Sequence, residues 1–148
     1  MPYRKHLIFG IFFLIITSCQ KETGFTLDNF KTLPKEIDGC SCLFSKTEKE
    51  YRQNEFVFAS NFDSIAFVSI DNKIVKLKLA SKTNKPHTME NENYTCKYYT
   101  EEYKITIEIE ADKTKPDSDE SWWNKGLLII ENKTGKKITQ KFIGESGC

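Results

Sequence analysis

Strict alternation of apolar and polar residues between Tyr103 and Ala111 constrains the fold of this chain more than any other feature. The apolar side chains occupy every second position, namely Tyr103, Ile105, Ile107, Ile109 and Ala111. Because successive side chains of a β-strand point to opposite faces, this period predicts a strand with one buried face and one solvated face. Further strands are needed to cover the apolar face, since one strand cannot bury it alone.

Most of the sequence between residues 55 and 143 has the same short period. Turn residues at 71–73 and 132–135 separate apolar runs and predict hairpins. Strands are expected at residues 55–59, 64–70, 74–80, 94–100, 103–111, 122–131 and 136–143. No segment has a convincing helical period. We therefore predict an all-β fold, a small single-domain antiparallel barrel or sandwich of about seven or eight strands.

The N-terminus has the composition of an export signal. Arg4 and Lys5 precede an apolar run from residue 7 to residue 16 that contains no charged side chain. A membrane-spanning helix needs roughly 20 apolar residues, whereas the apolar part of a secretory signal needs only about 7–15 behind a basic start. We therefore expect this run to direct export and not to span a membrane.

The end of the apolar run resembles the lipobox of bacterial lipoproteins, because Ile16, Thr17 and Ser18 place an aliphatic residue and two small ones directly before Cys19. The resemblance implies cleavage before Cys19 and acyl chains on its thiol, which anchor a protein without a transmembrane helix. It divides the chain into a signal peptide (1–18), a lipidated N-terminus and tether (19–35) and an all-β domain (36–148). An ordinary secretory signal with an incidental cysteine is the alternative.

The residues that follow Cys19 bear on location and partners. The position next to it is Gln20, and not the Asp that resembles an inner-membrane retention signal. We expect attachment to the bacterial outer membrane, with the domain facing the periplasm or the cell surface. Loss of Arg4 and Lys5 with the signal leaves basic and acidic side chains nearly balanced. The expected partners are therefore the membrane, through the lipid, and a protein or glycan of the envelope, but no nucleic acid.

Four cysteines remain once Cys19 is set aside as the lipidated residue: Cys40, Cys42, Cys96 and Cys148. An even number in an exported chain predicts disulfides. A bond between Cys40 and Cys42 would close a very small ring against normal disulfide geometry, so one of the two is expected to join Cys96 and the other Cys148. The bond to Cys148 would hold the C-terminus. A four-thiolate zinc site is the alternative, but the C-x-C pair and the two isolated cysteines do not match its usual C-x-x-C halves, and we predict no metal.

Few residues suggest catalysis. The mature chain has a single histidine, His87, within a polar stretch and without a nucleophile motif. Carboxylate pairs such as Glu101 with Glu102, or Asp117 with Asp119, are candidates for glycosidase chemistry, but solvated charge at loops and strand ends explains them more simply. We predict no catalytic residue and no cofactor other than the lipid, and we rank a carboxylate-pair hydrolase as the least favoured function.

Two adjacent tryptophans, Trp122 and Trp123, are the most informative candidates for binding. Neighbours in a strand point to opposite faces, so only one of the two indoles can enter the core of a single sheet. The other is expected either to be covered by a loop or to be exposed. An exposed indole would serve as a platform for a sugar ring or a partner protein.

The sequence Trp123-Asn124-Lys125-Gly126, which follows a long polar loop, together with the terminal cysteine resembles the membrane-bound lysozyme inhibitors of the C-type family. These are lipid-anchored small β-barrels that insert polar side chains into the lysozyme cleft. The resemblance implies that Lys125 is the inserted cation. The family's S-G-x-x-Y motif is absent before Tyr94, where Glu92 and Asn93 stand. Our leading hypothesis is thus a non-catalytic envelope lipoprotein with a binding or structural role, and the lysozyme inhibitor is the alternative.

Overall fold

A computed structural model describes residues 24–62, 64–83 and 93–148, which form one antiparallel sheet and one short helix. The elements in chain order are β1 (Leu27–Asp28), β2 (Ser41–Ser45), α1 (Glu48–Arg52), β3 (Phe58–Asn61), β4 (Ile65–Ile70), β5 (Lys73–Lys82), β6 (Tyr94–Tyr99), β7 (Tyr103–Ala111), β8 (Ser121–Asn132) and β9 (Lys137–Gly147). No helix in these ranges is long and apolar enough to cross a membrane.

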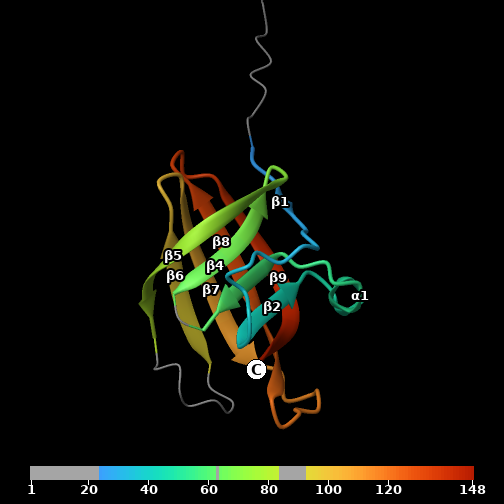
Figure 1. The fold of residues 1–148 in the computed structure, drawn as a ribbon. Coiled ribbons are helices and arrows are strands. Elements are labelled where there is room, and N and C mark those ends of the chain that lie inside the picture. Colours follow the sequence, from blue (N-terminus) through green and yellow to red (C-terminus); the bar gives the residue numbers. More distant parts are fainter. Residues whose placement is uncertain (1–23, 63, 84–92) are drawn as a thin grey trace, which may run out of the picture.

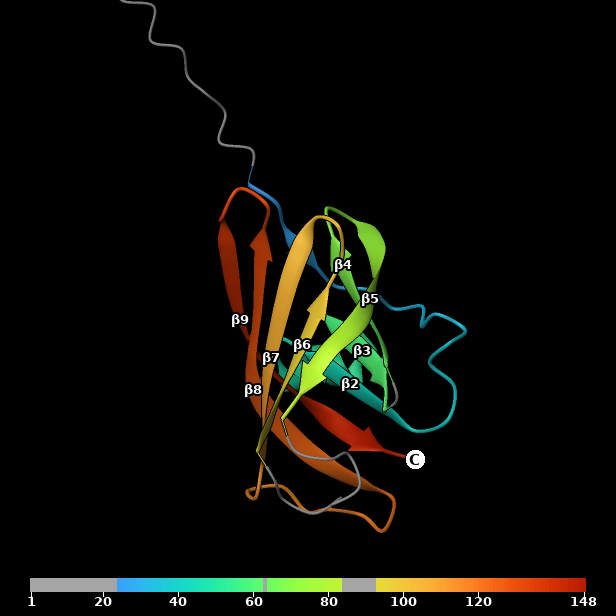
Figure 2. The ribbon, with the colours of Figure 1, turned by 90° about the vertical axis from the view of Figure 1, so that its left-hand side faces the viewer.

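The sheet closes into a barrel (Figures 1 and 2). Its strand order is β1-β4-β3-β2-β9-β8-β7-β6-β5, and an additional pairing of β4 with β5 closes the sheet from β4 round to β5. Eight strands therefore form the barrel, while β1 is an extra strand that pairs with the end of β4 through Leu27 and Ile70. This arrangement confirms the predicted all-β class and decides in favour of the barrel over the sandwich.

The predicted hairpins form where the turn chemistry favours them. Asp71 and Asn72 connect β4 to β5 with positive φ angles of 49° and 60°, the conformation of the turns whose twist matches two antiparallel strands. Gly135, at φ 81°, lies in the turn between β8 and β9. The strands nevertheless extend further than alternation indicated, because β9 continues to Gly147 and β5 to Lys82.

The structure contains elements that the sequence analysis did not predict, β2 and α1 among them. β2 precedes a single helical turn, α1, which begins after the cap residue Thr47, whose side chain accepts a hydrogen bond from the Glu50 amide. An ion pair between Glu48 and Arg52 at i, i+4 adds support. Five residues are too few to show a helical period, and for this reason the expectation of a chain without helix was wrong at α1.

The barrel interior is filled by side chains. Its largest fully buried apolar residues come from six of the strands or their flanks: Phe44, Val57, Phe58, Val68, Leu77, Ile105, Ile107, Leu128 and Ile130. The Phe44 ring stacks on those of Phe142, with 4.4 Å between centroids, and Phe58, with 5.8 Å. Close packing of this kind fills this part of the barrel interior with side chains.

A second apolar cluster lies on the outside of the barrel. Phe30, Phe56, Ala59 and Phe67 are buried there, with Leu33 and Ile37 packed against them. Phe30 also exchanges backbone hydrogen bonds with Phe56. The segment expected to be a tether, residues 19–35, is described from Gly24 onward, and this part of it packs against the barrel.

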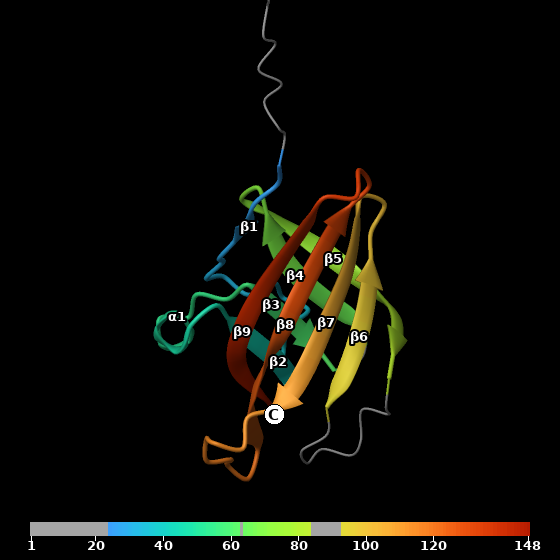
Figure 3. The ribbon, with the colours of Figure 1, turned by 180° about the vertical axis from the view of Figure 1, so that it is seen from behind.

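The two ends of the barrel differ (Figures 1 and 3). At one end, which we call the tether end, the described chain starts at Gly24 beside the turns at 71–72, 100–102 and 132–136. At the opposite end, the disulfide end, lie Cys40, Cys148 and the loop of residues 112–120. The C-terminus and this loop are adjacent, because the Cys148 amide donates to the Glu120 carbonyl.

Candidate functional site

The two tryptophans of β8 lie at the disulfide end with different neighbours. The Trp122 ring stacks on Phe62, with 6.1 Å between centroids and 14° between planes, and Phe62 packs against the barrel core. The Trp123 ring contacts Tyr51 of α1, with centroids 5.2 Å apart. Both indoles keep part of their surface exposed. Strand alternation therefore separates them, as their adjacency in sequence predicts.

The cover over Trp123 comes from two distant segments. Lys115, from the loop before β8, places its Nζ 5.2 Å from the centre of the indole and forms an ion pair with Glu48 of α1. On the α1 side, Tyr51 donates a hydrogen bond of 3.1 Å from its hydroxyl to Glu145 of β9. Burial, followed by the charge of Glu145, raises the pKa of Tyr51 well above its usual range, so the phenol keeps its proton.

Lys125 extends this surface along the same strand. Its side chain is 49 % exposed, and its Nζ lies 3.8 Å from Oδ1 of Asp112, whose side chain is 7 % exposed. Asp112 also accepts hydrogen bonds from the Thr114 hydroxyl, at 2.7 Å, and the Thr114 amide. These bonds, with a smaller contribution from Lys125, hold the pKa of Asp112 below its usual value. The buried Asp112 is thus held in its ionised form beneath the half-exposed Lys125.

A hollow of about 150 Å³ adjoins the Tyr51 side of this surface. Its walls include Ser41 and Leu43 of β2, Ser121 of β8, Tyr51 and Glu145. We use the term Trp123 surface for Trp123, Lys125, Lys115, Tyr51 and Glu145 together. It combines an indole and a phenol, the aromatic groups that are enriched at binding surfaces, with two lysines and a carboxylate.

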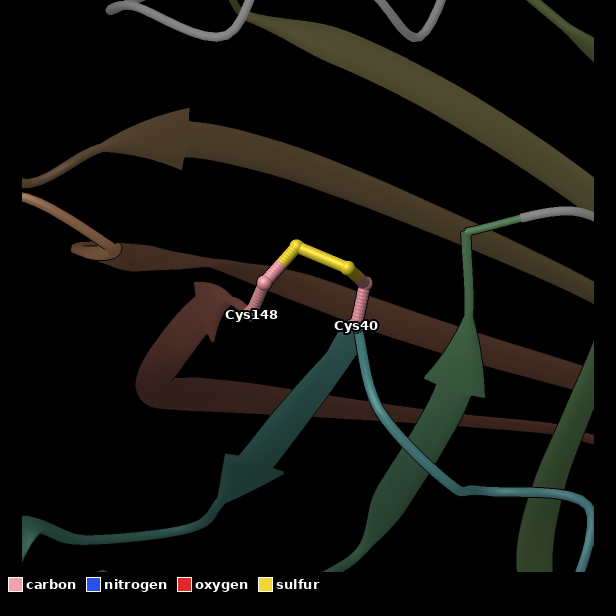
Figure 4. Close-up of a disulfide and its surroundings, with 2 residues drawn as sticks. All are labelled: Cys40 and Cys148. Atoms are coloured by element: carbon pink, nitrogen blue, oxygen red, sulfur yellow. A yellow bond between two sulfur atoms is a disulfide. The ribbon is translucent and has the colours of Figure 1, made fainter.

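The disulfide that was predicted for Cys148, the last residue, is present. Cys40, directly before β2, is joined to Cys148, directly after β9, across a separation of 108 residues (Figure 4). The disulfide therefore holds the C-terminus at the rim of the barrel, as the sequence predicted for Cys148.

The second predicted disulfide is not formed. Cys42 and Cys96 are both free thiols, and both are buried. They belong to β2 and β6, which have three strands between them in either direction around the barrel. Cys42 instead accepts a hydrogen bond of 3.1 Å from Ser146, which in turn accepts one of 2.8 Å from Asn124. Burial raises the pKa of Cys42, and burial raises that of Cys96 to about 11, so both sulfurs remain protonated thiols.

The other candidate groups do not meet at this surface. Glu101 and Glu102 lie in the turn at the tether end, whereas Asp117 and Asp119 are exposed in the loop at the disulfide end. Across the described ranges, no three His, Cys, Asp or Glu side chains are close enough to hold a metal ion. Cys19, the signal peptide and His87 lie outside the described residues.

Sequence reasoning selected Trp122, Trp123 and Lys125, but it did not select the residues that complete the surface. Tyr51 and Glu145 are 94 positions apart in the chain and meet only because α1 packs beside β9. Nothing in the local pattern around either residue indicates this contact. Comparison of the chain with protein-family models, with curated proteins and with solved structures found no match in any of the three.

Proposed function

We propose that this chain is a lipid-anchored envelope protein whose β-barrel binds a protein or glycan partner through the Trp123 surface and performs no catalysis. The lipobox at Cys19 supports the anchor and an outer-membrane location. The single observation that carries the binding role is that aromatic and charged side chains meet on the outside of the barrel, where Trp123, near the disulfide end of β8, contacts Tyr51 of α1. An anchored barrel would present that end to its surroundings.

The packed interior supports a role on the outer surface. Barrels that carry small ligands enclose a cavity, whereas this one is filled by rings such as Phe44, Phe58 and Phe142. We therefore expect a ligand to bind at the rim or on an outer face. Near the disulfide end, the partly exposed Trp123 and Tyr51 are of the types of side chain that dominate binding energy at interfaces. The half-exposed Lys125 lies two residues further along β8.

Metabolic labelling tests the anchor. Cells that express the full chain are fed an alkyne-bearing fatty acid, and labelled protein is detected after click coupling. We expect label on the wild type and none on Cys19→Ala, with Cys96→Ala as the matched control that should keep the label. Label that persists on Cys19→Ala would exclude lipidation at this residue.

A capture experiment tests the binding role. The lipidated protein is cross-linked in intact envelopes, and its partners are identified by mass spectrometry for the wild type, for Trp123→Ala with Lys125→Ala, and for Lys133→Ala at the tether end. We expect the first variant to lose a partner that the control retains. If all three proteins capture the same set, the Trp123 surface is not the binding site.

Inhibition of lysozyme is the second candidate, and the observation that favours it is the exposure of Lys125 next to the Trp123 indole on a small barrel. The mature domain is added to a lysozyme lysis assay together with Lys125→Ala and, as a control, Lys141→Ala on β9. Inhibition that Lys125→Ala abolishes and Lys141→Ala preserves would support this candidate. No inhibition at micromolar concentration would eliminate it.

A further inference from the structure

The first described residues are held firmly at one end of the barrel. The Phe25 ring packs on Tyr103, with centroids 5.4 Å apart, and the Thr26 amide donates to the Asp71 carboxylate at 2.8 Å. Leu27 then pairs with Ile70 in the sheet. The described chain thus begins with contacts to two of the barrel's turns.

The length of chain before this point limits how far the tether end can be from a lipid on Cys19. Only residues 20–23 separate Cys19 from Gly24. A fully extended chain spans at most about 3.6 Å per residue, so Gly24 lies within about 18 Å of the lipidated residue. Strand β8, with 12 residues, alone is roughly 40 Å long at about 3.3 Å per residue. The disulfide end is accordingly much further from the anchor when the barrel stands upright.

The exposed apolar side chains are concentrated at the same end. Among the described residues, the two large apolar residues that are about half exposed are Ile74, at 47 %, and Tyr99, at 52 %. Ile74 follows the turn at 71–72, and Tyr99 precedes the turn at 100–102. Tyrosine is favoured at the boundary of a bilayer, because its ring is apolar and its hydroxyl is polar.

The charges at the turn that follows Tyr99, and at the turn between β8 and β9, are mixed. A hollow of about 350 Å³ lies between the turns at 100–102 and 132–136. Its lining includes both cations and carboxylates: Glu101, Glu102, Lys104, Glu131 and Lys133. A surface with both signs complements headgroups that carry a phosphate and an ammonium together, and it has no net attraction for an anionic leaflet.

We infer that the tether end of the barrel rests on a zwitterionic phospholipid surface, with Ile74 and Tyr99 at the level of the headgroups. This inference rests on the proposed lipidation of Cys19. It deepens the proposed function, because contact at the tether end directs the Trp123 surface away from the membrane.

Depth-dependent quenching tests the orientation. The full lipidated protein is reconstituted in phosphatidylcholine–phosphatidylethanolamine vesicles that contain a headgroup-nitroxide lipid, with a fluorophore on Lys133→Cys at the tether end or Asp117→Cys at the disulfide end. We expect several-fold stronger quenching of the first probe. Equal quenching, or stronger quenching at Asp117→Cys, would overturn the inference.

Two further measurements identify the cause of any failure. Co-flotation with the vesicles is scored first, because a protein that does not float contradicts the lipid anchor and hence the proposed function, whereas one that floats but shows equal quenching contradicts only the orientation. In the Lys133→Cys background, Ile74→Ser with Tyr99→Ser should weaken the quenching, while Leu127→Ser on the side of the barrel should not. Ile74 and Tyr99 are exposed, so the double substitution to serine should leave the melting temperature nearly unchanged. Quenching that survives the double change at full strength would exclude a role for the two side chains.

Discussion

The disulfide between Cys40 and Cys148 lies one residue beyond the Ser41–Gly147 pair, the last pair of the ladder that joins β2 to β9. Strand ends fray first when a sheet opens, and this bond closes the ladder at the point where fraying would start. It also joins two positions that are 108 residues apart, so it restricts the unfolded chain strongly.

Loss of this bond should destabilise the barrel without changing its fold. We expect Cys148→Ser to lower the free energy of unfolding by about 2–5 kcal/mol, because the unfolded chain regains the entropy of an open loop. Thermal unfolding of the mature domain, followed by circular dichroism, measures this. Cys40→Ser and the double substitution should match Cys148→Ser. A melting temperature that reductant leaves unchanged in the wild type would contradict the prediction.

The free thiols should react only when the barrel opens. Burial raises the pKa of both Cys42 and Cys96, so neither the access nor the thiolate that alkylation requires is present in the folded state. Mass spectrometry of the non-reduced mature domain from Gln20 onward should show no added group in native buffer. Two alkyl groups should appear in denaturant. Zero groups in denaturant would instead indicate that these cysteines form a second disulfide.

Gly126 of β8 should tolerate no larger side chain. A Cβ at this position would overlap the carbonyl oxygen of Glu108 on the neighbouring strand and approach the Phe142 ring. Gly126→Ala should therefore cost about 1–3 kcal/mol through displaced backbone and ring, measured by urea unfolding. Gly24→Ala is the matched control, since no atom lies within 4 Å of a Cβ there. Equal stability of the two variants would argue against this packing of β7 on β8.

Asp112 should make the stability depend on pH. Its pKa is lowered in the folded state, chiefly by hydrogen bonds from Thr114, so its contribution is complete above the unfolded pKa of about 3.9 and is lost as the pH falls through the folded value. Asp112→Asn should cost about 1 kcal/mol near pH 7. The difference from the wild type should shrink towards zero in acid. Asp117→Asn, in the exposed loop, is the matched control in the same urea titrations.

The local alternation of apolar and polar residues was sufficient to predict a strand where one face of that strand is solvated. β5 and β7 alternate over many residues, so their existence could be predicted from neighbours in the sequence alone. β2 was not predicted because its five residues carry apolar groups on both faces, with Cys42 and Phe44 inside the barrel and Leu43 beneath the outer cluster. Its apolar residues therefore do not alternate with polar ones.

The sequence by itself determined the all-β class, the turns and the presence of a disulfide at Cys148, because periodicity, turn chemistry and cysteine number act locally or by count. Only the tertiary structure decided which cysteine pairs with it. The β2–β9 register places Cys42 opposite Ser146, so Cys40, two residues earlier, is the one beside Cys148. Closure through β4 and β5, and the meeting of Tyr51 with Trp123 and Glu145, were likewise decided by long-range packing that no local pattern encodes.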